Sequence, residues 1–342
     1  MSQAPSFSVI SGAQVSRVLR GQEKRVVELI ETAYRTHGLG RTVNPPSYFL
    51  RFEDRPTARI IALPASIGWP ANVDGLKWIS SFPENVASGL PRASAVLVLN
   101  SPATGYPFAC LESSIISAVR TAASAALAAD RLAKGRVRPA RVGFIGTGLI
   151  ARYIHTYLTG TGWDFDEVGV HDLSIEHATG FKSYVEGSGG RARVRGSAEE
   201  LIRESDLVVF ATVAGTPHVH EPAWFEHNPL VLNVSLRDLA PEVILSAVNI
   251  VDDVDHCLKA DTSPHLAEQQ VGHREFLHGT LYDVLTGAVD VPADRPVVFS
   301  PFGLGVLDLA VGKHVYDEIV AAGELQVVPD FFSELHRYGS PR

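Results

Sequence analysis

The chain has 342 residues, a formal net charge of −8 and 45% hydrophobic residues, which fits two domains with the composition of an ordinary globular protein. The acidic balance argues against nucleic acid as a partner, because binding a phosphate backbone needs a basic face. No stretch approaches the roughly 20 continuous apolar residues of a membrane span, and the N-terminus shows no signal peptide. We therefore expect a cytoplasmic protein that binds no membrane, with Cys110 and Cys257 as free thiols.

The first third of the chain has the pattern of an α+β domain. Residues 7–10 resemble a short strand, and Ser11 is a suitable N-cap for one helical stretch with apolar residues at helical spacing (Val26, Val27, Ile30 and Tyr34). Turns that contain proline and glycine separate further strand patterns at 58–63, 73–79 and 93–99. A long helical pattern of small residues, 112–134, is expected to link two domains.

From Arg141 onward the pattern alternates between strand and helix. Strand patterns occur at 141–146, 167–172, 191–195, 206–212, 230–235, 249–253 and 296–300. Helical patterns between them, such as 198–205 and 241–247, predict a parallel doubly wound sheet. A late helix at about 304–323 and a strand at 325–328 are expected to return to the first domain.

The sequence thus predicts an α/β protein of two domains. A Rossmann domain is expected over residues 126–310, and a discontinuous α+β domain over residues 1–125 and 311–342. We expect ligand to bind in the cleft between these two halves.

The loop after the strand at 141–146 carries the most specific motif. Gly146 permits a tight turn, Gly148 lets the backbone approach a pyrophosphate, and Ala151 is small enough for the helix to pack on the strand. The next strand ends in Asp172, whose carboxylate would accept hydrogen bonds from ribose hydroxyls and repel a 2′-phosphate. These features predict a dinucleotide site that prefers NAD to NADP. An ordinary glycine-rich turn with a surface aspartate is the alternative.

Two basic residues of the first domain are candidates for chemistry. Lys77, in an alternating strand, points away from Leu76 and Trp78, although this pattern alone favours a solvated lysine. Arg120 lies in the alanine-rich helix, where it either reaches the surface or enters the cleft.

Other polar residues carry weaker indications. Arg92 lies in a turn, and Gly303 is either a second close-approach turn or a helix start. Asp238 follows a strand at its carboxyl end, where doubly wound sheets hold functional groups, but it could equally cap a helix. Histidines without metal-ligand spacing are expected on the surface or in loops, so we expect no metal: His218, His220, His227, His256 and His265.

Over nearly its whole length the chain resembles the ornithine cyclodeaminase and mu-crystallin family. The resemblance lies in the segments 75–78 (Gly-Leu-Lys-Trp), 105–107 (Gly-Tyr-Pro), 119–123 (Val-Arg-Thr-Ala-Ala), 145–148 (Ile-Gly-Thr-Gly) and 233–238. Segments such as 78–81, 170–172 and 235–238 look like the branch that makes L-2,3-diaminopropionate for siderophores and antibiotics. That branch oxidises N-(2-amino-2-carboxyethyl)-L-glutamate with NAD and releases L-2,3-diaminopropionate and 2-oxoglutarate.

The resemblance also implies roles for single residues. Lys77 matches the active-site lysine, Asp238 the catalytic aspartate and Arg120 the arginine that binds the substrate carboxylate. Arg92 and Arg51 are further candidates for binding the substrate. The cofactor positions are Thr121, Gly146, Thr147, Gly148, Leu149, Ile150, Asp172, Thr212, Ser235 and Gly303.

The expected reaction moves a hydride from the glutamate α-carbon to the nicotinamide and leaves an imine, which water then attacks. A base must accept the proton of the secondary amine, and either Lys77 or Asp238 could be this base or activate the water. Family members look like homodimers in which the first domain binds substrate and forms the dimer.

Two other functions remain open. One is another reaction on the same scaffold, namely cyclodeamination, oxidative deamination of the alanine type or ketimine reduction. The loop around Asp238 reads Ser-Leu-Arg-Asp-Leu-Ala-Pro, whereas ornithine-cyclising members have a loop rich in glycine with a cysteine, which argues against cyclodeamination. The other is a binding protein without catalysis, against which the retained Lys77, Arg120 and Asp238 argue.

Overall fold

The structure is a computed structural model that describes residues 5–333. It divides into two compact units: unit 1 comprises the residues up to Arg120 and those from Leu304, and unit 2 comprises Thr121–Gly303. Unit 1 is therefore discontinuous in sequence, and its boundaries lie a few residues from those expected at 125 and 310. The helix α3 (Ser114–Leu132) runs unbroken through the first boundary, so no turn residue marks this boundary in the sequence.

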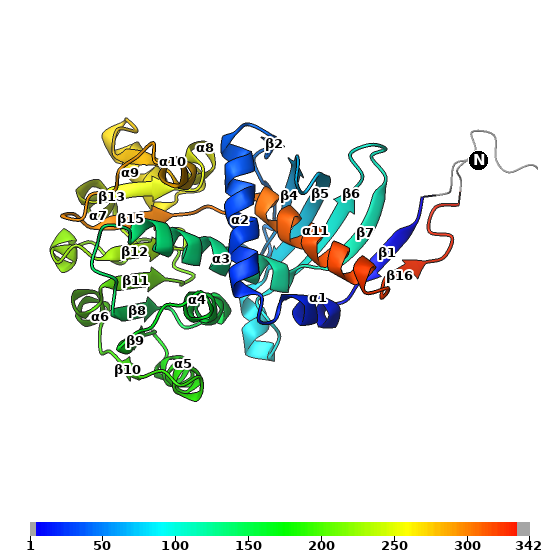
Figure 1. Cartoon of the computed structure of the whole chain (residues 1–342). Coiled ribbons are helices and arrows are strands. Elements are labelled where there is room, and N and C mark those ends of the chain that lie inside the picture. The colour runs from blue at the N-terminus through cyan, green and yellow to red at the C-terminus, as the bar shows by residue number, and fades with distance from the viewer. Residues whose placement is uncertain (1–4, 334–342) are drawn as a thin grey trace, which may run out of the picture. The chain divides into compact units, whose positions relative to one another are not determined.

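Unit 1 is built on a mainly antiparallel sheet (Figure 1). Its strands are β1 (Phe7–Ile10), β2 (Thr42–Val43), β3 (Tyr48–Arg51), β4 (Arg59–Ile67), β5 (Val73–Ser81), β6 (Ala93–Asn100), β7 (Pro107–Glu112) and β16 (Gln326–Val328). They follow the order β16-β1-β7-β6-β5-β4-β2, and β3 also pairs with β4. The expected strands are confirmed, including the return of the C-terminal strand beside β1, whereas β2, β3 and β7 were not predicted.

Helices α1 (Gly12–Leu19), α2 (Glu23–Gly38) and α11 (Gly305–Ala321) lie on one side of this sheet (Figure 1). The prediction of one helical stretch after Ser11 was wrong, because Gly21 adopts a φ of 72° and separates α1 from α2. Ser11 caps α1 in a reciprocal capping box with Gln14. The 3-10 helix η1 (Pro83–Ser88) connects β5 to β6.

Unit 2 is the expected parallel doubly wound sheet. Its strands are β8 (Arg141–Ile145), β9 (Glu167–His171), β10 (Ala192–Val194), β11 (Leu207–Phe210), β12 (Leu230–Asn233), β13 (Val248–Val251), β14 (Leu277–Thr280) and β15 (Val297–Ser300). The order is β10-β9-β8-β11-β12-β15-β13-β14, with neighbours parallel. Strand β14 was not predicted. The chain order reverses between β8 and β11, the point at which such sheets bind ligands.

The connections of unit 2 are short helices, as the sequence predicts. They are α4 (Leu149–Gly160), α5 (Ile175–Gly187), α6 (Ala198–Glu204), α7 (Pro241–Ser246), α8 (Val254–Cys257), α9 (Ser263–Val271), α10 (Leu281–Thr286) and the 3-10 helix η2 (Pro222–Phe225). Every residue of β11, β12, β13 and β15 is buried, because helices cover both faces of a sheet of this kind. Within residues 5–333 no helix has the length and apolarity to span a bilayer.

Candidate active site

The glycine-rich loop of unit 2 has the conformation that a dinucleotide requires. Gly146 has a φ of 84°, and a Cβ there would lie 2.7 Å from the carbonyl oxygen of Ala211, so only glycine fits. A Cβ on Gly148 would meet no described atom within 4 Å, so a ligand can approach this backbone. Gly148 also caps α4 without a side chain, which leaves N–H groups of the first turn, including those of Leu149 and Ile150, open to an anion.

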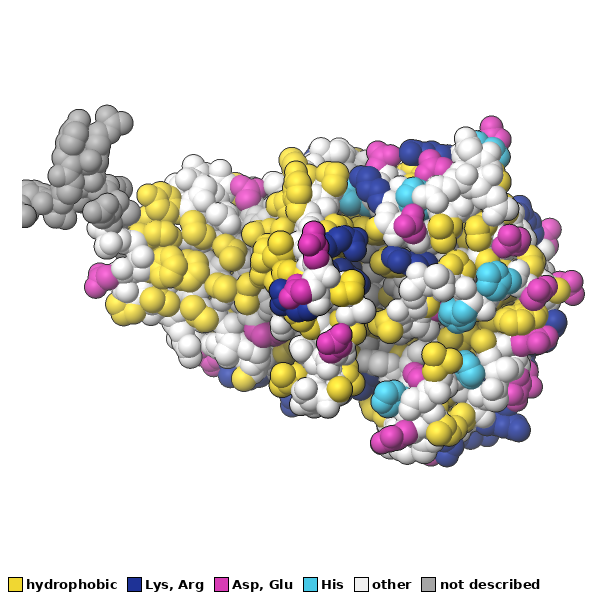
Figure 2. Space-filling model, turned by 180° about the vertical axis from the view of Figure 1, so that it is seen from behind, with side chains coloured by type: hydrophobic (Ala, Val, Ile, Leu, Met, Phe, Trp, Pro, Cys, Tyr) yellow, Lys and Arg dark blue, Asp and Glu magenta, His cyan; other side chains and the backbone are white. Residues whose placement is uncertain are grey.

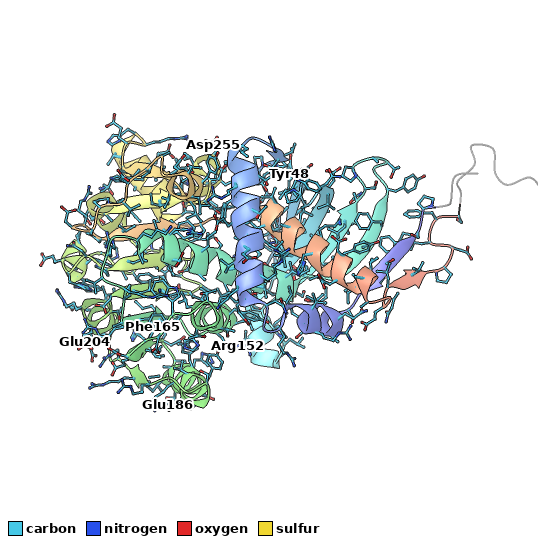
Figure 3. All side chains as sticks on the ribbon, in the orientation of Figure 1. Tyr48, Arg152, Phe165, Glu186, Glu204 and Asp255 are labelled. Carbon is cyan, nitrogen blue, oxygen red and sulfur yellow. The ribbon has the colours of Figure 1, made fainter. Side chains whose placement is uncertain are left out.

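Arg152 adds a cation to the first turn of α4. Its side chain is exposed (Figure 3), and sequence analysis did not assign it a role. A guanidinium beside open N–H groups suits a pyrophosphate, since both attract negative charge.

Asp172 lies directly after β9 and is hydrogen-bonded to the glycine-rich loop. One carboxylate oxygen accepts from the N–H and the hydroxyl of Thr147 at 2.9 and 2.7 Å, and the other accepts from the N–H of Ser174 at 2.9 Å. Burial by itself would raise the pKa of Asp172, but the donors of Ser174 and Thr147 outweigh it and the pKa is lowered. The carboxylate is therefore ionised beside the loop.

Asp238 is fully buried in the loop after β12 and is joined to the loop after β11. Its Oδ1 accepts from the hydroxyl of Thr212 at 2.5 Å and pairs with Nε2 of His218 at 2.8 Å. Its Oδ2 is buried without a hydrogen-bond partner among the described residues. Sequence analysis expected His218 on the surface or in a loop, and it does lie in a loop. The contact with Asp238 was missed, because only the adjacency of β11 and β12 brings the two residues together. Ser235 is also buried in this loop.

The loop at Gly303 is held by a buried carboxylate. Gly303 has a φ of 98° and donates its N–H to Asp252 at 2.7 Å, and the same carboxylate accepts from the N–H of Phe302 at 3.0 Å. Asp252 is 2% exposed at the end of β13. Gly303 is not the start of the helix, since α11 begins at Gly305, and its positive φ favours glycine. Its approach to the cofactor stays a prediction.

Unit 1 contains a buried cluster of charges around Asp308. Lys77 Nζ lies 2.6 Å from Asp308 Oδ2, Arg120 Nε lies 3.3 Å from Oδ1, and Lys77 Nζ lies 3.4 Å from the hydroxyl of Ser117. The exposed fractions of the Lys77 and Asp308 side chains are 2% and 0%. Burial lowers the pKa of Lys77 to about 8, against the opposing effect of Asp308 and with the support of Arg120. Lys77 is therefore not a solvated strand lysine, and Arg120 contacts this cluster.

Close packing of α11 on the sheet brings Asp308 to Lys77. A Cβ on Gly75 would lie 2.7 Å from a methyl group of Leu309, and one on Gly312 would lie 2.1 Å from Leu97. Gly305, Asp308 and Gly312 share one face of α11, because residues three and four apart are neighbours on a helix. Asp308 was not predicted as a site residue. The sequence offered one indication, since Asp308 lies three residues after Gly305 and four before Gly312, on the helix face that the two glycines allow to pack closely.

The other predicted arginines lie further along the same face of the sheet. Arg51, Arg59 and Ser81 are aligned across β3, β4 and β5. Arg92 donates to the Ser81 hydroxyl at 2.7 Å. Side chains four residues apart on a strand share a face, so this row lies about 13 Å from Lys77 along β5. Arg51 itself is exposed and stacks on Phe49, so its role stays a prediction.

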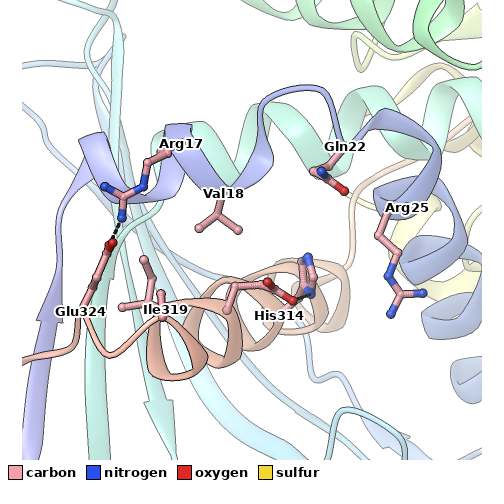
Figure 4. Close-up of a pocket in the computed structure, with 9 residues that line it drawn as sticks. Arg17, Val18, Gln22, Arg25, His314, Ile319 and Glu324 are labelled. Carbon is pink, nitrogen blue, oxygen red and sulfur yellow. Dashed lines mark hydrogen bonds and ion pairs between the residues drawn. The ribbon is translucent and has the colours of Figure 1, made fainter.

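A surface hollow between α1, α2 and α11 contains none of these residues (Figure 4). Arg17 and Glu324 form an ion pair at its rim. Thr121, the remaining predicted cofactor residue, follows Arg120 in α3 as the first residue of unit 2.

The chain belongs to the ornithine cyclodeaminase/mu-crystallin family, whose model matches residues 12–323. It is 31% identical over 299 residues to an alanine dehydrogenase of Archaeoglobus fulgidus, covering 85% of this chain and 89% of that protein. It is 29% identical over 304 residues to the N-((2S)-2-amino-2-carboxyethyl)-L-glutamate dehydrogenase of Staphylococcus aureus, with the same coverage.

Solved structures agree with this assignment. An archaeal alanine dehydrogenase dimer with bound NAD matches with a TM-score of 0.84 and 29% identity, covering 96% of this chain and 100% of that one. The predicted family and fold are confirmed. The prediction of an NAD-dependent oxidoreductase is confirmed at the level of the family, since these relatives are dehydrogenases of amino acids.

Proposed function

We propose that this protein oxidises N-(2-amino-2-carboxyethyl)-L-glutamate with NAD and water to L-2,3-diaminopropionate, 2-oxoglutarate and NADH. The observation that carries the proposal is the basic face of the unit 1 sheet, where Lys77 and Arg120 share one carboxylate, Asp308. Two cations and one anion leave a net positive charge, and Arg92 and Arg51 add more along the same face. A substrate with three carboxylates fits such a face better than alanine, which has one.

One of the comparisons supports this substrate. The Staphylococcus aureus relative bears this activity in its name. The alanine dehydrogenase is slightly more similar, at 31% against 29% identity, so this proposal prefers the glutamate derivative to alanine because of the basic face alone. We place the activity in the biosynthesis of a siderophore or antibiotic that contains diaminopropionate.

The residues of unit 2 fit NAD. The Gly146 turn, the open N–H groups at the start of α4 and the ionised Asp172 would hold the pyrophosphate and the adenosine ribose. Bound NAD supplies a hydride acceptor. The carboxylate clamp of Lys77 and Arg120 would fix the glutamate α-carbon for this transfer, an orientation effect that can be worth several kcal/mol.

Proton transfer needs two groups in this proposal. Lys77, with a pKa of about 8, is mostly charged at pH 7 and about a tenth neutral. The neutral form takes the proton of the secondary amine. We assign the later water step to the pair formed by Asp238 and His218.

The test is the absorbance of NADH on mixing purified protein with NAD and N-(2-amino-2-carboxyethyl)-L-glutamate. We expect NADH from this substrate and an equal amount of 2-oxoglutarate. L-Ornithine, L-alanine and L-glutamate are the comparison substrates. NADH from alanine alone contradicts the proposal, and ammonia released from ornithine without net NADH identifies a cyclodeaminase.

Asp172 is expected to set the choice between NAD and NADP. Asp172→Asn removes the negative charge but keeps a hydrogen-bonding side chain, so the preference for NAD should fall about 10- to 100-fold, the factor for 1–3 kcal/mol of lost repulsion. The ratio of kcat/KM for the two cofactors measures this. Asp166→Asn, in the turn before β9, is the control, and an unchanged ratio in Asp172→Asn would contradict the role of this carboxylate.

We propose that the protein is a homodimer formed by unit 1. On the sheet face opposite Lys77, three exposed hydrophobic residues are aligned across β3–β6: Tyr48, Trp78 and Val96. Their exposed fractions are 69%, 42% and 40%. Hydrophobic side chains gather on this face (Figure 2). A second copy would cover this face, and the similar alanine dehydrogenase is described as a dimer. Light scattering should give the mass of two chains, and of one chain for Trp78→Glu. A single-chain mass for the unchanged protein would refute the dimer.

A further inference from the structure

The loops after β11 and β12 hold a histidine and a carboxylate beside the dinucleotide loop. Strands β8, β11 and β12 are neighbours in the parallel sheet, so the loops that follow them lie at one edge. The backbone of Gly146 approaches Ala211 so closely that a Cβ would clash with it, so the first two loops touch. The N–H groups of His218 and Val219 both donate to the carbonyl oxygen of Asp238 at 3.0 Å, which joins the second loop to the third.

The contacts of Asp238 determine which nitrogen of His218 carries a proton. The hydroxyl oxygen of Thr212 accepts a hydrogen bond from the N–H of Ala214, and the hydroxyl proton is donated to Asp238 Oδ1. The same carboxylate oxygen can only accept, so Nε2 of His218 must donate to it. Nδ1 then holds a lone pair, and it has no partner within residues 5–333.

The two members of this pair differ in their exposure to solvent. Asp238 is 0% exposed and cannot meet bulk water, whereas the His218 side chain is 40% exposed. Lys77 is 2% exposed, so it too is poorly placed to recruit water. His218 is the group near the dinucleotide loop that combines a free lone pair, an orienting carboxylate and access to solvent.

We propose that His218 is the acid–base catalyst of imine hydrolysis and that Asp238 is its positioning residue; this rests on the proposed function. Water attacks the imine carbon and forms a C–O bond while Nδ1 of His218 takes one water proton. The imidazolium returns that proton to the bridging nitrogen. The proton of the new hydroxyl group then passes through His218 to the same nitrogen as the carbonyl forms and the C–N bond breaks with its electron pair on nitrogen, so the products are a neutral amine and 2-oxoglutarate. The only oxidant consumed is the NAD of the preceding step.

His218→Ala should therefore slow hydrolysis but spare hydride transfer. On rapid mixing we expect a burst of about one NADH per active site, followed by steady turnover reduced about 10²- to 10³-fold, the usual contribution of a general acid–base group. Added imidazole should restore turnover. His220→Ala, in the same exposed loop, should behave as the unchanged protein.

Quenching with borodeuteride identifies the species that accumulates. Deuteride converts trapped imine into substrate labelled at the glutamate α-carbon, and converts 2-oxoglutarate into labelled 2-hydroxyglutarate. We expect labelled substrate from His218→Ala and labelled 2-hydroxyglutarate from the unchanged protein, as read by mass spectrometry. Unimpaired turnover of His218→Ala, or loss of its NADH burst, would overturn the inference while the proposed function stands. Absence of NADH from the unchanged protein would refute the proposed function itself.

Discussion

Replacing Lys77 by methionine should reduce kcat/KM by about 10³-fold or more, because this buried side chain binds substrate in its charged form and accepts the amine proton in its neutral form. Lys77→Arg keeps the positive charge but cannot be deprotonated in proteins. It should therefore lose turnover while keeping more of the substrate affinity. The binding of NAD should stay unchanged in both variants, since the dinucleotide loop belongs to the other unit.

Steady-state kinetics and titration with NAD test this prediction. The matched control is Lys313→Met. Lys313 lies on α11, pairs with Asp317 and has no proposed part in binding or reaction. Turnover of Lys77→Met within a few-fold of the unchanged protein would remove Lys77 from the mechanism.

The pH dependence gives a second readout of Lys77. Only the neutral amine accepts a proton, so kcat/KM should rise with pH through about 8, the pKa to which burial lowers this group. A flat profile across this pH would show that Lys77 is not the base.

Asp308→Asn should lower kcat/KM about 10²- to 10³-fold, because it removes the carboxylate that positions Lys77 and balances Arg120. Asp308 raises the pKa of Lys77 by its charge and its hydrogen bond. Without it the pKa of Lys77 falls further, so the rising limb of kcat/KM should move to lower pH. A purely structural role would not produce this shift.

Asp317→Asn is the matched control for Asp308, since Asp317 lies on the same helix but pairs with Lys313 at the surface. It should leave both the rate and the pH profile unchanged. The melting temperature should fall in Asp308→Asn, since two buried cations lose their partner. An unshifted profile in a folded Asp308→Asn variant would contradict the proposed effect of Asp308 on Lys77.

Local pattern was sufficient to predict most of the fold. The strand at 141–146, the glycine loop and Asp172 were legible because a βαβ unit places turn, helix and acid within one short segment. Two kinds of error remained. Gly21 divides a helix whose apolar spacing continues on both sides. Strands such as β3 and β14 do not alternate between buried and exposed residues, so they lack the period of a half-buried strand.

Short motifs also predicted part of the candidate site, whereas contacts between distant residues could not be predicted. Lys77, Arg120 and Asp238 were named from the sequence because each belongs to a short motif that resembles a known family. Asp308 could not be assigned to Lys77, since 231 residues separate them in the chain and only the packing of α11 on β5 brings them together.

The sequence by itself determined the family, the class of cofactor and the order of most strands and helices, because these depend on short-range pattern. Only the tertiary structure decided which charges meet. Burial of Lys77 beside Asp308, and of Asp238 behind an exposed His218, follows from the close approach of elements distant in the chain. Removal from water and contact with neighbouring charges set the proton affinity of a group, and both are properties of the packed protein.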